Sequence, residues 1–178
     1  MLELDFFLPF LVALCGSAAL ALRPPATLAS LAITLAAGVV GGITPLPRGS
    51  EERGGGRLPW TWTTLIGVAA FVAARVLQHP MAPRIAPLFV AATAAAGAAE
   101  ELLFRRLLYG ALAVYGAATA VGGSAVVFAA VHVPAYGVAA FPIDLAAGLL
   151  FGWQRWASGT WTASSVTHAA ANVLQTAW

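Results

Sequence analysis

Charged side chains are scarce in this chain, and that scarcity limits what it can fold into. Of its 178 residues, 9% are charged and 60% are hydrophobic, whereas a soluble domain carries about 25% charged residues. A water-soluble fold of this length would lack the polar surface to cover its core. The mean hydropathy of +0.84 and the continuous apolar runs, which do not alternate as in a membrane β-barrel, predict an all-α polytopic membrane protein.

The apolar runs are separated by short polar or proline-containing breaks. At about 20 residues per span, the chain holds six to seven transmembrane helices in one membrane domain covering residues 1–178. The stretch 48–59 carries charges of both signs and three consecutive glycines, and we expect it to be a solvated loop. The expected helices cover residues 6–22, 26–43, 60–77, 85–109, 117–133, 142–156 and 160–178, with a short connecting helix at 110–116 and a helix end at Pro134.

The charge balance points to a lipid bilayer as the main partner and away from nucleic acid. The formal net charge is only +2, and the basic residues of the chain are too scattered for a nucleic-acid surface. The single Cys15 cannot form an intrachain disulfide. The content of Ala, Gly, Arg and Pro is typical of GC-rich coding, so we expect the cytoplasmic (inner) membrane of a bacterium. The mixed charges of the loop leave the orientation undetermined.

Ionisable residues inside the predicted spans are costly and usually face a cavity or a partner. They gather at three places on three different predicted helices, which favours one convergent site inside the membrane region over unrelated packing pairs. These places contain Glu100, Glu101 and Arg105; Phe128 and His132; and His168 and Asn172.

Helix geometry separates the two neighbouring glutamates. Residues four apart share a face, so Glu101 and Arg105 can form an ion pair. Glu100 lies about 100° round the helix from Glu101 and is free to point at something else, such as a water molecule. By the same spacing, His168 and Asn172 point at one spot, and Phe128 packs against or shields His132.

Three motifs in this order, Glu-Glu-x-x-x-Arg, Phe-x-x-x-His and His-x-x-x-Asn, resemble the CAAX prenyl protease and bacteriocin-processing family of intramembrane proteases, also called the Abi or Rce1-like family. The resemblance covers about residues 92–178 and includes the stretches 148–153 and 159–164. It implies a peptide-bond hydrolase whose catalytic core is this half of the chain.

The resemblance also implies a role for each motif residue. Glu100 would be the general base that activates water, helped by His132. His168 and Asn172 would stabilise the oxyanion of the tetrahedral intermediate. Glu101 and Arg105 would be structural or would orient Glu100.

No cofactor is expected, although zinc is an alternative that the residue types allow. Two histidines and a glutamate are a valid catalytic zinc set. The chain has no His-Glu-x-x-His helix, which would place two histidines and the base together, and Asn172 is a poor zinc ligand. A glutamic-type mechanism is therefore favoured over a zinc-dependent one.

The expected substrates are peptides or proteins with a hydrophobic C-terminal segment, such as the C-terminal sorting tails of exported proteins. Prenylated substrates fit a bacterial chain less well. Two other classes remain open: a non-catalytic membrane scaffold or immunity protein of the same fold, and a proton or ion pathway, which also uses Glu and His in membranes. The intact motifs argue against a scaffold, and an ion pathway does not need Asn172 on the face of His168.

Overall fold

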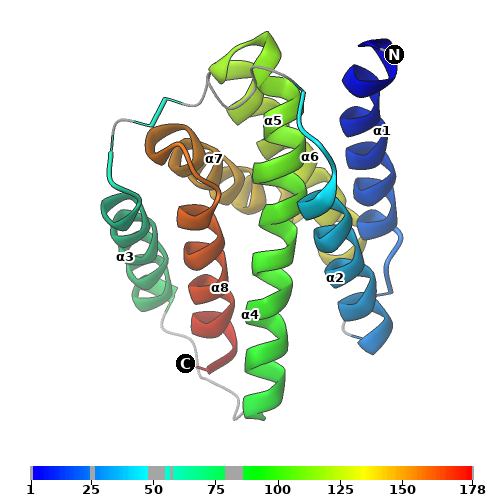
Figure 1. The fold of residues 1–178 in the computed structure, drawn as a ribbon. Coiled ribbons are helices and arrows are strands. Elements are labelled where there is room, and N and C mark those ends of the chain that lie inside the picture. The colour runs from blue at the N-terminus through cyan, green and yellow to red at the C-terminus, as the bar shows by residue number, and fades with distance from the viewer. Residues whose placement is uncertain (1, 25–26, 48–54, 57, 79–85, 178) are drawn as a thin grey trace.

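The computed structural model describes residues 2–24, 27–47, 55–56, 58–78 and 86–177, and over these residues it is all-α, as the sequence predicts. They form seven helical rods (Figure 1). In chain order the elements are α1 (Leu2–Ala21), α2 (Leu28–Ile43), α3 (Trp60–Gln78), α4 (Pro87–Glu101), the π-helix η1 (Leu102–Leu108), α5 (Tyr109–Leu112), the 3₁₀ turn η2 (Ala113–Tyr115), α6 (Ala117–Tyr136), the 3₁₀ turn η3 (Val138–Ala140), α7 (Phe141–Ser158) and α8 (Thr162–Ala177).

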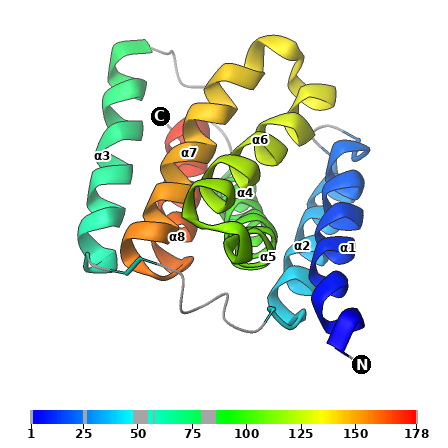
Figure 2. The same ribbon diagram turned by 90° about the horizontal axis from the view of Figure 1, so that it is seen from above.

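One long rod runs through the middle of the bundle. It consists of α4, η1, α5 and η2 without a break, and the other helices surround it when the bundle is seen from above (Figure 2). In Figure 1, α8 descends beside α4 on one side and α2 lies on the other. Side chains in the middle of this rod are therefore enclosed by the rest of the chain.

Glycines allow the neighbouring helices to approach the rod closely. A Cβ atom at Gly38 of α2 would lie 2.6 Å from the Cβ atom of Ala99, and one at Gly41 would lie 2.9 Å from the Cα atom of Leu103. Small residues that let helix backbones meet are typical of helix packing in lipid. Helix α2 thus contacts the rod immediately before and immediately after Glu100 and Glu101.

Three helices are long and apolar enough to cross a membrane, judged by length and composition. They are Trp60–Gln78, Pro87–Tyr115 and Ala117–Tyr136, and two shorter apolar helices cover Phe6–Ala21 and Leu28–Ile43. Large hydrophobic side chains also stand exposed on the outer faces of several helices, including Leu14, Trp62 and Leu77. Exposed large apolar side chains on several helices are typical of a protein that faces lipid.

Two of the expected helix boundaries are wrong. The segment expected as a separate helix at 110–116 continues the central rod as far as Tyr115, and Gly116, at φ +104°, separates the rod from α6. Helix α6 also continues through Pro134 and ends before Gly137, at φ +81°. A proline removes a helix hydrogen bond, but membrane helices tolerate it where neighbouring groups satisfy the freed carbonyl.

Most of the loop expected at 48–59 lies outside the described residues. The described end of the loop is attached to the end of α7. The Gly56 N–H donates to the Trp156 carbonyl at 2.8 Å, and the Leu58 N–H donates to the Ala157 carbonyl at 2.9 Å.

Candidate active site

Two adjacent carboxylates occupy the point where the central rod changes from α-helix to π-helix. Glu100 and Glu101 are the last two residues of α4, and they are 5% and 0% exposed. The π-helix η1 begins at the next residue. Short π-helical segments inside α-helices occur frequently at functional sites. The change of helix type was not predicted from the sequence.

Glu101 is the internal partner of two other site residues. Its Oε2 atom forms the predicted ion pair with Arg105, 3.5 Å from Nε, and its Oε1 atom lies 3.0 Å from Nδ1 of His168. Arg105 is fully buried and also donates from Nη2 to the Gly148 carbonyl at 3.1 Å. The contact between Glu101 and His168 was not predicted, because the motif spacing pairs Glu101 only with Arg105, on its own helix.

Both histidines turn the same ring nitrogen towards Glu100. The Oε2 atom of Glu100 lies 3.6 Å from Nε2 of His132 and 4.0 Å from Nε2 of His168. Nδ1 of His132 lies 2.7 Å from the Phe128 carbonyl, which can only accept, so this nitrogen carries the proton. Nδ1 of His168 faces the Glu101 carboxylate in the same way. Each Nε2 is thereby held at the Glu100 carboxylate.

Aromatic rings enclose the polar cluster. The Phe128 ring packs 4.6 Å from the His132 ring, as predicted, and meets the His168 ring edge-on at 5.6 Å. Phe151 stacks on His168 at 4.8 Å, and the Arg105 guanidinium lies 4.8 Å from the centre of the Phe128 ring. Phe151 was not among the predicted site residues, although it lies in the stretch 148–153 that carries the family resemblance.

A second arginine, which was not predicted as a site residue, holds the other oxygen of Glu100. Arg23 follows the end of α1, and its Nη1 atom lies 2.6 Å from Oε1 of Glu100 and 2.7 Å from Oγ1 of Thr34. The sequence carries no signal for this contact. An arginine at the end of an apolar run is normally an interfacial residue.

Asn172 lies beside His168, towards the start of α4. Its Nδ2 atom donates to the Thr93 carbonyl at 2.8 Å. A Cβ atom at Gly97 would lie 2.8 Å from Nδ2 of Asn172 and 3.1 Å from Cδ2 of His168. The two α8 side chains therefore share one face, as their spacing predicts. An amide nitrogen has two hydrogens, so Nδ2 can still donate to a substrate.

The described residues include no group of three or more His, Cys, Asp or Glu side chains arranged to hold a metal ion. The cationic partner of Glu100 in this structure is the guanidinium of Arg23, 2.6 Å away.

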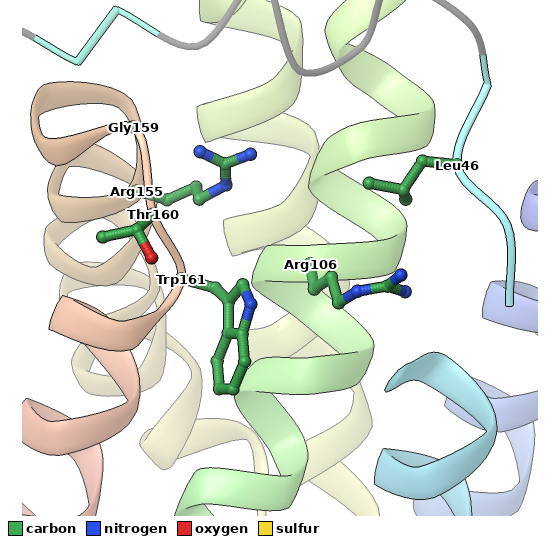
Figure 3. Close-up of a pocket in the computed structure, with 6 residues that line it drawn as sticks. All are labelled: Leu46, Arg106, Arg155, Gly159, Thr160 and Trp161. Carbon is green, nitrogen blue, oxygen red and sulfur yellow. The ribbon is translucent and has the colours of Figure 1, made fainter. Parts of the chain in front are cut away.

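A pocket of about 270 Å³ lies elsewhere, near the turn between α7 and α8 (Figure 3). The side chain of Arg106 points away from Arg155 towards α2, where it donates to the carbonyls of Gly41 and Thr44 at 2.7 and 3.0 Å. The pocket shares no lining residue with the carboxylate–histidine cluster, so it is separate from the candidate active site. Its lining residues are Leu46, Arg106, Arg155, Gly159, Thr160 and Trp161.

The fold and the cluster together define a class of protein: an all-α chain with long apolar helices around a buried set of carboxylates, imidazoles and guanidiniums. The chain belongs to the Rce1-like type II CAAX prenyl endopeptidase family, whose family model matches residues 81–174. The matched range contains the three predicted motifs. No curated protein and no solved structure matches the chain. Family membership points to a protease acting on peptide substrates, and the long apolar helices suggest an integral membrane protein.

Proposed function

We propose that this protein is an intramembrane endopeptidase of the glutamic type, in which Glu100 activates the attacking water. The observation that carries the proposal is the arrangement around one buried oxygen. Oε2 of Glu100 has the Nε2 atoms of His132 and His168 at 3.6 and 4.0 Å. A carboxylate and two imidazoles in a water-poor site can move protons and stabilise a developing negative charge.

The reaction follows from these positions. Oε2 of Glu100 accepts a proton from water while the water oxygen bonds to the substrate carbonyl carbon. The carbonyl oxygen becomes an oxyanion, which accepts hydrogen bonds from Nε2–H of protonated His168 and from Nδ2 of Asn172. The C–N bond then breaks, and Glu100, assisted by His132, returns the proton to the leaving nitrogen.

The remaining motif residues position these groups. Glu101 accepts from Nδ1–H of His168 and so orients the imidazole ring with Nε2 towards the reacting groups. Arg105 balances the charge of Glu101 inside the bundle. Phe128 and Phe151 keep the two imidazoles in place and limit access of bulk water.

In this proposal the whole chain contributes to the site. Residues 1–178 form one membrane domain of six to seven spans with the site inside the membrane region, a catalytic core at 92–178 and a solvated loop at 48–59. The contacts of Arg23 and Thr34 support it, because they join α1 and α2 to Glu100. The membrane is the bacterial cytoplasmic membrane, and the substrates are peptides or hydrophobic C-terminal sorting tails of exported proteins.

A cleavage assay with the purified full chain in detergent tests the proposal. Hydrophobic peptides with the composition of such tails are incubated with the protein, and the products are identified by mass spectrometry. Cleavage at a defined bond is expected. If no peptide is cleaved while the protein in liposomes conducts protons, the protein is an ion pathway. If it does neither, a scaffold role is favoured.

The same assay tests the mechanism. Without a catalytic metal, a strong chelator leaves turnover unchanged, and purified active protein contains no stoichiometric zinc. Loss of turnover on chelation, with recovery on adding zinc, would show that the zinc-dependent alternative is correct.

A further inference from the structure

Arg23 caps the carboxylate that serves as the base in the proposed reaction. Its Nη1 atom bridges Oε1 of Glu100 at 2.6 Å and Oγ1 of Thr34 at 2.7 Å. The side chains of Arg23 and Glu100 are only 8% and 6% exposed. Thr34 is itself buried and donates to the Ser30 carbonyl of its own helix at 2.9 Å. The ion pair is therefore enclosed, and α2 holds the guanidinium in place.

This cap opposes the proposed role of Glu100. A carboxylate paired with a guanidinium accepts a proton less readily than an unpaired one, whereas a general base works best when its proton affinity suits the operating pH. The paired arrangement is thus a resting arrangement. An anion that arrives with the substrate and takes Arg23 as its partner would release Glu100.

The chemistry of Arg23 fits a carboxylate as that anion. A guanidinium binds carboxylates through two parallel N–H bonds, and its bonds to Glu100 and Thr34 both come from Nη1. Each peptide brings one terminal carboxylate regardless of its sequence. Entry of that charge into an enclosed apolar site requires a positive partner, and Arg105 is already paired with Glu101.

We propose that Arg23 is a specificity-determining latch. In the resting enzyme it pairs with Glu100; on binding, it changes partner to the C-terminal carboxylate of the peptide, and Glu100 becomes free to act as base. This inference rests on the proposed function and narrows its substrates to peptide bonds close to a free C-terminus. It also places a specificity residue outside the family-matched range 81–174.

Pairs of hydrophobic peptides that differ only in a C-terminal acid or amide test the latch. The full chain in detergent is assayed with both members of each pair, and kcat/KM is measured by mass spectrometry. The wild type should prefer the acid by about tenfold or more, as expected for charge-assisted hydrogen bonds. Arg23→Gln should lower cleavage of the acid and raise cleavage of the amide, bringing the two within about twofold. An arginine with only a structural role would change both rates in parallel.

Two further variants keep the result interpretable. Arg106→Gln removes an equal charge that also bonds to α2 but does not contact Glu100, and it should keep the wild-type preference. Arg23→Lys keeps the positive charge but lacks the two parallel N–H groups of the guanidinium, so its preference for the acid over the amide should be reduced. This variant tests the latch even if Arg23→Gln fails to fold. An undiminished preference in either Arg23 variant, or equal cleavage of acid and amide by the wild type, would overturn the latch alone. No cleavage of any peptide by the wild type would instead defeat the proposed function, and the latch with it.

Discussion

At the scale of single residues, the two adjacent glutamates differ because a helix points them at different neighbours. Glu101 contacts Arg105 and His168, whereas Glu100 contacts Arg23 and faces the two Nε2 atoms. In the proposed mechanism, Glu100 is therefore the base and Glu101 is a positioning residue.

Glu101→Gln should lower both stability and activity. The substitution leaves Arg105 without its counter-charge in a buried place and loosens His168. Removing one member of a buried ion pair costs about 3–5 kcal/mol in soluble proteins. Thermal unfolding in detergent measures the loss. The double variant Glu101→Gln/Arg105→Met should unfold at a higher temperature than the single variant, because no unpaired charge remains. A single variant as stable as the wild type would show that the pair is not important to the fold.

Asn172→Ala separates an oxyanion donor from a packing residue. Loss of a donor to the oxyanion lowers kcat by about 10²–10³, whereas loss of the bond to the Thr93 carbonyl alone costs about 0.5–1.5 kcal/mol of stability. We expect the large fall in kcat, with KM little changed. A variant that unfolds earlier but turns over normally would remove Asn172 from the proposed mechanism.

The sequence predicts contacts within one helix better than contacts between helices. The pairs Glu101–Arg105 and Phe128–His132 are present as expected, because the helical period alone sets which residues share a face. The contact of Arg23 with Glu100 was missed. It depends on how α1 and α2 pack against the rod, and no periodic signal in one sequence encodes that packing.

At the scale of elements, apolar runs and their breaks locate the helices well, whereas local irregularities of the backbone are not predicted from the sequence. The π-helix η1 consists of Leu, Phe and Arg, which also form ordinary α-helices, so its composition does not predict a π-helix. The passage of α6 through Pro134 was also missed. In both places the surrounding helices decide the local backbone, not the intrinsic preferences of the residues.

Gly97→Ala tests the close packing that holds the α8 residues at the site. The added Cβ atom would lie 2.8 Å from Nδ2 of Asn172 and 3.1 Å from Cδ2 of His168. Overpacking of this kind costs about 1–3 kcal/mol, and a displaced His168 should also lower turnover. The matched control is Gly122→Ala in α6, where a Cβ atom would meet nothing within 4 Å and activity should be kept. Normal turnover in Gly97→Ala would show that this contact does not position the site.

At the scale of the whole molecule, composition alone predicts the class, because so few charges cannot cover a soluble core. The number of spans is harder to read. Helix α8 is rich in Ser, Thr, His and Asn, and it is not among the three long apolar helices. Ser164, Thr167 and His168 are buried against the rest of the chain. A helix that directs its polar residues inward in this way can cross a membrane with modest overall hydropathy.

The most direct test of the central claim is the turnover of Glu100→Gln. This change keeps the shape of the side chain but removes its ability to accept a proton, so cleavage of a peptide that the wild type cuts should be abolished. The variant should still insert into membranes and give a cooperative unfolding transition in detergent. Near-normal turnover in Glu100→Gln, together with a stable but inactive Glu101→Gln, would contradict the proposed mechanism and assign the base to Glu101.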